Sequence, residues 1–347
     1  MSIQTERFGR LPDGREAQLF TLKNSSGMTL KVTNYGCRIV SLLVKDRNGA
    51  LGDVVLGHRA LEEYFGANYQ GTFVGRYANR IGGAKFSLNG MTYALSQNDG
   101  NNTLHGGPGG YHQVLWNAEL REGEEPAIVF THTSPDGDEG YPGELRMTVT
   151  YTLTKENELV LEYTGLSDQE TPFNPTNHSF FNLSGDPQKE IFGTSLTLYA
   201  SAVTQVSDEL IPTGTLLPVA GGPLDFTKGK ELGKDMFADD HLIRLCGGFD
   251  HNFCVDGESL RKHGEAYEPE SGRVMEVFSD LPGVQLYTFN KVEGLTGKDG
   301  KPMKPHTAFC LETQFYPDSV NHPEFPFRYL QPGVPFTTKT IYRFSVK

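Results

Sequence analysis

The sequence predicts an all-β fold with only short helices, and three observations support this prediction. The 347 residues include 40 glycines and 20 prolines, about one residue in six against roughly one in eight in average soluble proteins, which indicates many turns. Apolar and polar residues alternate in many short segments, as in half-buried strands. Almost no window of about 11 residues combines an apolar helical stripe with freedom from glycine and proline.

The predicted elements follow one another along the chain between clusters of turn residues. Strands are expected at 28–32, 38–44, 85–88, 91–95, 127–132, 147–151, 159–163, 194–200, 273–279, 284–289, 308–315 and 337–346. Asn89-Gly90 is the strongest local signal, because it supplies the two positive φ angles of a type I′ hairpin turn. Short helices are expected near 61–65 and 317–321. The polar stretches 134–144 and 293–304 are expected to be exposed excursions.

Composition and charge exclude several classes of partner. The net charge of −12 should repel phosphate backbones and anionic lipid headgroups, so neither nucleic acid nor a membrane is an expected partner. A hydrophobic fraction of 37% can fill a large core. The chain shows no repeat, low-complexity tract or linker, which favours a single domain over 1–347.

The N-terminal residues and the cysteines indicate a compartment. No apolar run of signal-peptide or membrane-spanning length occurs, so a cytoplasmic location is expected. The four cysteines, at 37, 246, 254 and 310, match neither a zinc pattern nor a small disulfide scaffold, and free thiols are expected.

Several loops carry planar polar side chains near aromatic ones, a combination that suits sugars. Asn79 and Arg80 lie between glycine clusters, although Arg80 could equally be a structural loop arginine. His105 lies in a glycine-rich loop that lacks the phosphate-loop pattern, and a lone loop histidine is more often a surface or capping residue. His178 precedes Phe180 and Phe181. Desolvation by these apolar neighbours would lower the pKa of His178. The alternative is a hydrogen-bonded histidine in the core.

Two carboxylates complete the candidate set. Asp250 follows a glycine pair that could aim it at ligand hydroxyls, or it could close an Asx turn. Glu312 lies in the middle of an apolar strand, and we expect both faces of that strand to be covered. A buried carboxylate there needs a partner or a raised pKa, which is the environment of a general base; a satisfied structural glutamate is the alternative.

Seven motifs in order along the chain resemble those of the aldose 1-epimerase (galactose mutarotase) family. They are GRYANRI, NTLHGG, TNHSFFNL, LIPTG, FDHNF, SGRVMEVFSDLPGVQLYT and CLETQFYPDS, between residues 75 and 319. The resemblance covers essentially the whole chain. It implies a large antiparallel β-sandwich, the galactose mutarotase-like supersandwich, with a sugar cleft on one sheet and no cofactor; the missing ligand patterns predict that no metal is bound.

The resemblance also implies roles for individual residues. Glu312 matches the family's general base and His178 its general acid for opening and reclosing the ring of aldohexoses such as galactose and glucose. The sugar-contacting positions match Asn79, Arg80, His105, Asp250 and Gln285. Two small departures, in FNPTNHSFF and GGFDHNF, lie beside site residues and affect only the expected sugar preference. The chain is expected to be a monomer or a homodimer.

Other functions compete with this reading of the residues. A glycoside hydrolase would also need two carboxyl groups, which Asp250 and Glu312 could supply. A lectin-like module would bind sugar without reacting, which leaves a desolvated glutamate unexplained. A metal enzyme is disfavoured by the lack of an HExxH motif or a close histidine pair along the sequence.

Overall fold

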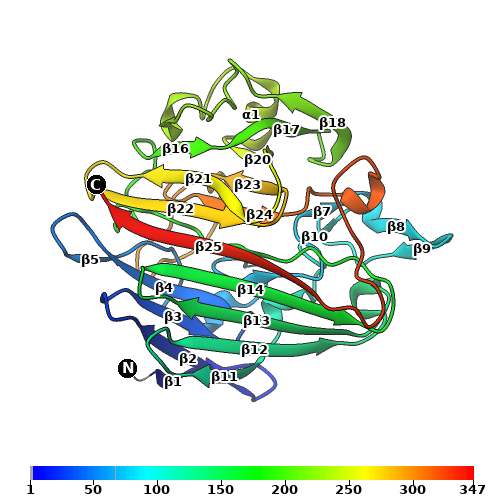
Figure 1. The fold of residues 1–347 in the computed structure, drawn as a ribbon, viewed down its shortest axis with the longest axis horizontal. Helices are drawn as coiled ribbons and strands as arrows, with labels where there is room; N and C mark the ends of the chain where they lie inside the picture. Colours follow the sequence, from blue (N-terminus) through cyan, green and yellow to red (C-terminus); the bar gives the residue numbers. More distant parts are fainter. Residues whose placement is uncertain (1–2, 67) are drawn as a thin grey trace.

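The computed structural model describes residues 3–66 and 68–347, and its described part is built mainly from antiparallel strands (Figure 1). The largest sheet has nine strands in the order β11 (Asn117–Arg121), β12 (Ala127–Ser134), β13 (Leu145–Leu153), β14 (Glu158–Ser167), β25 (Phe336–Val346), β22 (Arg273–Ser279), β21 (Arg261–Tyr267), β16 (Ser195–Leu198) and β19 (Lys230–Glu231). The C-terminal strand β25 lies inside this sheet, where it pairs with β14 on one side and β22 on the other.

Two five-stranded sheets and three strand pairs complete the β-structure. One sheet runs β1 (Gln4–Arg10), β2 (Glu16–Lys23), β3 (Thr29–Thr33), β4 (Arg38–Lys45) and β5 (Leu51–Asp53). The other runs β18 (Pro212–Pro218), β17 (Ala200–Val206), β20 (Asp250–Val255), β23 (Gly283–Tyr287) and β24 (Cys310–Gln314). The pairs are β6 (Phe73–Val74) with β15 (Thr176–Asn177), β7 (Arg80–Ile81) with β10 (Thr103–Leu104), and β8 (Lys85–Leu88) with β9 (Met91–Ala94).

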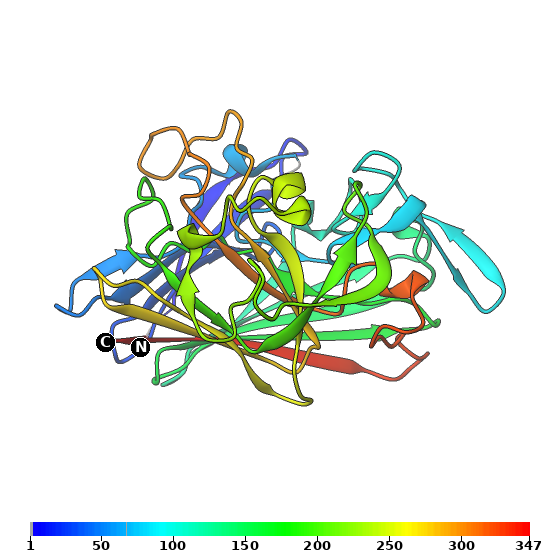
Figure 2. The ribbon, with the colours of Figure 1, turned by 90° about the horizontal axis from the view of Figure 1, so that it is seen from above.

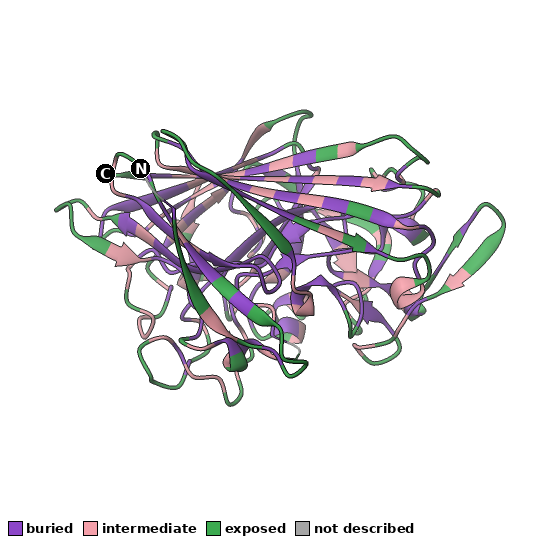
Figure 3. Cartoon of the chain, turned by 90° about the horizontal axis from the view of Figure 1, so that it is seen from below, coloured by how far each residue is buried: buried purple, intermediate pink, exposed green. Residues whose placement is uncertain are grey.

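The core lies between the nine-stranded sheet and the two smaller sheets. Residues of β13 and β14 alternate between buried and partly exposed positions, so one face of the large sheet is covered (Figures 2 and 3). Phe130 of this sheet packs against Phe20 of β2, with ring centroids 6.3 Å apart. Tyr342 of β25 donates a hydrogen bond to the Leu311 carbonyl of β24 at 2.9 Å. The predicted all-β sandwich is therefore confirmed.

The short helical segments are few and small. They are α1 (His241–Cys246) and the 3-10 turns η1 (Leu61–Tyr64), η2 (Gly82–Ala84), η3 (Tyr111–Gln113), η4 (Asp138–Gly140), η5 (Leu232–Lys234) and η6 (Ser319–Asn321). The predicted helices near 61–65 and 317–321 correspond to η1 and η6. No helix within the described residues has the length and apolar character needed to cross a bilayer.

Two local predictions agree with the structure, the second only in part. The hairpin β8–β9 turns at Asn89 and Gly90, whose φ angles of 53° and 77° are those of the predicted turn. The stretch 293–304 is mostly exposed, as expected, but Lys298 and Met303 anchor it to the rest of the molecule. Lys298 Nζ reaches Asp53 and two backbone carbonyls, and Met303 packs into a buried apolar cluster. Nothing in the local sequence around Lys298 or Met303 indicated this anchoring, because the partners of Lys298 and part of the cluster around Met303 lie far away in the chain.

Candidate active site

The seven polar residues selected from the sequence all line one cavity of about 290 Å³. This volume is at the lower end for ligand pockets, a size suited to one sugar ring. The residues are Asn79, Arg80, His105, His178, Asp250, Gln285 and Glu312. They lie far apart in the sequence, and the fold brings them together from two strand pairs and one five-stranded sheet.

Three neighbouring strands supply the carboxyl and amide groups of the cavity. In β23, Gln285 is paired in register with Glu312 of β24, and the neighbouring Tyr287 with Asp250 of β20. Gln285 Nε2 donates to Asp250 Oδ1 at 2.6 Å. The sheet therefore fixes two carboxyl groups with an amide between them, on the face that borders the cavity.

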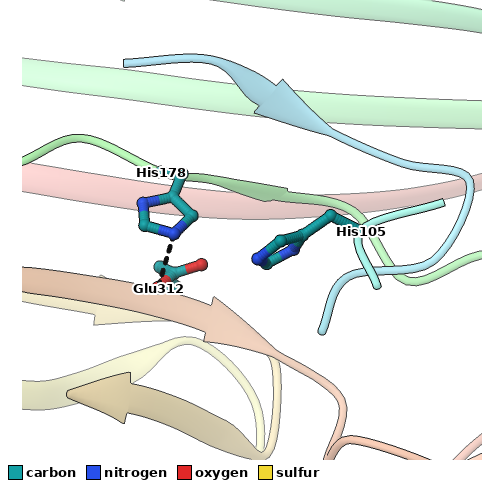
Figure 4. A group of neighbouring side chains, drawn as sticks. All are labelled: His105, His178 and Glu312. Carbon is teal, nitrogen blue, oxygen red and sulfur yellow. Dashed lines mark ion pairs between the residues drawn. The ribbon is translucent and has the colours of Figure 1, made fainter. Parts of the chain in front are cut away.

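His178 is held by backbone contacts immediately after β15. Its backbone N–H donates to the Thr72 carbonyl, and its own carbonyl accepts from the N–H of Gly71, both at 2.9 Å. The ring stacks on Phe180 with centroids 4.8 Å apart. Its Nε2 lies 3.6 Å from Glu312 Oε1, and both side chains are buried (Figure 4).

Asn79 fixes the tautomer of the His105 ring. The Asn79 backbone N–H donates to His105 Nδ1 at 3.2 Å, and the backbone N–H of His105 donates to the Asn79 carbonyl at 3.1 Å. Because Nδ1 is an acceptor, Nε2 carries the hydrogen of the neutral imidazole. The following Gly106 has a φ of +87°, and a Cβ there would meet the Gly75 carbonyl oxygen, so glycine is required for this close approach.

Burial shifts the pKa values of the buried pair in opposite directions. It raises the pKa of the Glu312 carboxyl well above its ordinary range, and the Asp250 carboxylate adds to this rise. It lowers the pKa of His178 to about 3. Both shifts favour the neutral forms. Over a wide pH range the pair therefore holds one titratable proton, shared between the carboxyl oxygen and His178 Nε2.

Three side-chain oxygen atoms of residues that line the cavity have no partner within the described part of the chain. Gln70 Oε1, Gln285 Oε1 and Glu312 Oε2 are buried oxygens without a hydrogen-bond donor there. Unpaired buried acceptors are costly, and all three residues border the cavity. The arrangement therefore suits a ligand that offers several hydroxyl donors.

His105, His178 and Glu312 also present ligand atoms within 4.8 Å of one another, near enough to share one metal ion (Figure 4). The sequence suggested no close histidine pair, but the two rings lie 5.3 Å apart. The hydrogen bonding does not fit a metal. His105 Nε2 carries a hydrogen because Asn79 occupies Nδ1, and a ligating nitrogen needs a free electron pair.

Arg80 is positioned through an ion pair. Its Nε donates to Asp99 Oδ2 at 2.7 Å, and its side chain remains only 14% exposed. The guanidinium therefore lies at the cavity wall with its charge compensated by Asp99. Arg80 thus has a structural ion pair and also borders the cavity.

Sequence reasoning missed the aromatic and amide residues that complete the wall. Tyr69 lies 4.7 Å from the ring of His105 and 4.7 Å from that of His112, in a loop without periodicity. Tyr287 and Phe289 lie within the predicted strand 284–289 but were not predicted to belong to the site. The further lining residues are Asn68, Gln70, Leu104, Phe180, Leu210, Cys246, Asn290, Lys291 and Leu295. The only feature of the sequence that could have indicated these residues is the group of aromatic and amide side chains in 65–70.

The two departures from the motifs, at the residue before TNH (Pro175) and the residue before DHN (Phe249), do not border the cavity. Pro175 is buried before β15, and Phe249 packs against Phe226 with ring centroids 5.2 Å apart. Neither is among the residues that line the pocket within the described part of the chain. Their influence on sugar preference would therefore be indirect, through the packing behind His178 and Asp250.

Comparison with known proteins gives one consistent family. The family model described as aldose 1-epimerase matches residues 18–343. Galactose mutarotase of Rattus norvegicus is 43% identical over 100% of this chain and 99% of its own. Aldose 1-epimerase of Escherichia coli is 33% identical, with 96% of each chain covered. A galactose 1-epimerase structure from Lactobacillus acidophilus superposes with a TM-score of 0.88 at 26% identity, covering 99% of each chain.

Proposed function

The chain belongs to the aldose 1-epimerase family, and we propose that it interconverts the anomers of aldohexoses with Glu312 as general base and His178 as general acid. The observation that carries this proposal is the 3.6 Å approach of His178 Nε2 to Glu312 Oε1 inside the sugar-sized cavity. The names of the relatives make galactose the first substrate to test.

The reaction needs a base at the anomeric hydroxyl and an acid at the ring oxygen. In the reactive form the one proton of the pair lies on His178 Nε2, so Glu312 is a carboxylate. Glu312 then removes the proton from the anomeric hydroxyl, and the electron pair of that O–H bond forms the C1 carbonyl. The bond from C1 to the ring oxygen breaks, and His178 protonates that oxygen. Rotation about C1–C2 presents the other carbonyl face, and the same pair closes the ring in reverse. Each acid or base contributes about 10²- to 10⁴-fold.

The hydrogen bonding distinguishes the two histidines. A second proton on His105 would have to sit on Nδ1, where the Asn79 N–H already donates. His105 is therefore a fixed neutral donor through Nε2, suited to a sugar hydroxyl. His178 has no such backbone donor on its ring, among the hydrogen bonds of the described residues, and it can carry the second proton that an acid needs.

The sugar hydroxyls are read by the remaining wall residues. These residues offer both hydrogen-bond donors and hydrogen-bond acceptors, and they are Asn79, Arg80, His105, Asp250 and Gln285. A buried polar site discriminates strongly against a ligand that leaves such groups unpaired. Galactose and glucose differ in the orientation of one hydroxyl, so both should react with different kcat/KM.

Substrates blocked at the anomeric oxygen test the reaction type. We expect rapid mutarotation of fresh α-galactose and α-glucose but no reaction of their methyl glycosides, because O1 then has no proton for Glu312 to remove. Polarimetry and an assay for methanol measure both. Release of methanol would favour a glycoside hydrolase using Asp250 and Glu312, and binding without faster mutarotation would favour a lectin.

The pH dependence should report the shared proton of the pair. The active state holds one proton, so kcat/KM should fall at high pH, where the raised pKa of Glu312 is exceeded and that proton is lost. Because the Asp250 charge contributes to this rise, Asp250→Asn should move the alkaline limb to lower pH. Asp99→Asn, which removes a carboxylate that does not act on Glu312, is the matched control. An unmoved limb in Asp250→Asn would contradict this account.

We expect activity to be independent of metal. The reason is the hydrogen on His105 Nε2 described above. Dialysis against a strong chelator should leave the mutarotation rate unchanged, with the same protein dialysed against buffer as control. Loss of activity that added zinc or manganese restores would contradict the expectation.

The cytoplasmic location stays a prediction, supported by four cysteines that are free and buried in the described part of the chain. The monomeric or homodimeric state is also a prediction, which sedimentation or light scattering can measure.

A further inference from the structure

We propose that Cys310 is a positioning residue for the reaction, which orients His178 by accepting a hydrogen bond from its Nδ1–H. The inference rests on the proposed role of His178 as the acid. Cys310 Sγ lies 3.5 Å from His178 Nδ1, and both side chains are buried.

One strand contacts both nitrogens of the His178 ring. Cys310 and Glu312 are two residues apart in β24, so their side chains point to the same face of the sheet. Glu312 Oε1 approaches Nε2 at 3.6 Å, and Cys310 Sγ approaches Nδ1 at 3.5 Å. The ring is therefore held at both ends by a single rigid element, in addition to its stacking on Phe180.

The proton balance of the reaction requires an acceptor at Nδ1. An imidazolium that donates from Nε2 to the ring oxygen also carries a hydrogen on Nδ1. In the neutral resting pair, the Glu312 proton faces Nε2 and the ring hydrogen again sits on Nδ1. The His178 backbone carbonyl, which accepts from the N–H of Gly71, also raises the pKa of the ring through a hydrogen bond, so it is a second acceptor beside the Cys310 sulfur. The other titratable groups around the ring are Tyr69, His105 and Tyr287, which face it with their rings.

A thiol suits this position because it is a weak, neutral acceptor. A carboxylate at Nδ1 would stabilise the imidazolium, as in the Ser-His-Asp arrangement, and would make His178 a weaker acid. Burial raises the pKa of the Cys310 thiol well above its ordinary range, so it stays uncharged. The sulfur can then orient the ring without holding its proton.

A packing role for Cys310 predicts a different order of variants. Cys310 belongs to an apolar cluster with Leu56, Phe180, Phe289, Met303 and Ala308. If it only filled space, alanine would be tolerated better than serine, because a buried hydroxyl in an apolar cluster is costly. If it accepts a hydrogen bond, serine should restore what alanine loses.

The kinetic experiment therefore compares Cys310→Ala and Cys310→Ser by polarimetry with fresh α-galactose. We expect Cys310→Ala to lower kcat about 10-fold, as loss of an orienting partner does elsewhere, with KM little changed, and Cys310→Ser to recover most of that loss. Cys254→Ala and Cys254→Ser provide the matched control, since Cys254 is also buried but packs in a separate cluster. Wild-type kcat in Cys310→Ala, or serine no better than alanine, would overturn the proposal.

An NMR measurement tests the same contact without turnover. Long-range ¹H–¹⁵N spectra of the full-length protein at neutral pH should show the hydrogen of His178 on Nδ1 and that of His105 on Nε2, with signals assigned from His178→Ala and His105→Ala. A bare His178 Nδ1 would overturn the role of Cys310. If His178→Ala itself kept normal activity, the proposed function would fail as well, so the two failures are distinguishable.

Discussion

Glu312→Gln should lower kcat about 10²- to 10⁴-fold, the contribution of one general base, and polarimetry with fresh α-galactose measures this directly. Glutamine keeps the shape of the side chain but cannot accept a proton at neutral pH. Its carbonyl oxygen can still face the sugar, so KM should change much less than kcat.

The same variant should fold about as stably as the wild type. Glu312 is only 2% exposed, and its Oε2 has no partner among the described residues. Burial keeps the Glu312 carboxyl neutral at rest, so a neutral glutamine of the same shape should leave the free energy of unfolding little changed. Glu119→Gln on the exposed strand β11 controls for the chemical change. Near-normal turnover of a folded Glu312→Gln protein would remove the base assignment.

His178→Ala should also lose most of the activity, by about 10²- to 10⁴-fold in kcat. Without the imidazole, the ring oxygen has no acid at its side, and water in a cavity of this size is a poor substitute. Because the ring also stacks on Phe180, thermal unfolding must accompany the kinetics. A folded variant with wild-type kcat would return His178 to a structural role.

His105→Ala provides the informative comparison. As a fixed neutral donor it binds a hydroxyl in both the ground state and the transition state, so its loss should raise KM and lower kcat together. The loss in kcat should be smaller than in His178→Ala. Equal losses, with KM unchanged in both variants, would mean that the two histidines share the acid role.

Local pattern predicted much of the fold because strands and tight turns are encoded over a few residues. The alternation around Glu312 placed that residue in a buried strand. In another part of the chain, Asn89-Gly90 predicted the turn of the hairpin β8–β9. Helix α1 was missed, since six residues are too short for helical periodicity. Its end signals were present, however: Asp240 caps the first turn, and Gly247 ends the helix at a φ of 70°.

The candidate site was predictable in composition but not in arrangement. The residue types suited to a sugar could be found in the sequence, whereas their distances depend on contacts between distant segments. The Cys310 contact with His178 spans 132 positions, and that of Asn79 with His105 spans 26. Tyr69 was missed for the same reason, because only the folded loop brings it against the two histidine rings.

The most direct test of the acid and base pair is a double-mutant cycle in the polarimetric assay, with wild type, Glu312→Gln, His178→Ala and the combined variant. Groups that act as a unit lose their effect together. If the two side chains share one proton across 3.6 Å, the combined variant should be no slower than the slower single variant. Losses that multiply, or a single variant with near wild-type mutarotation, would contradict the account.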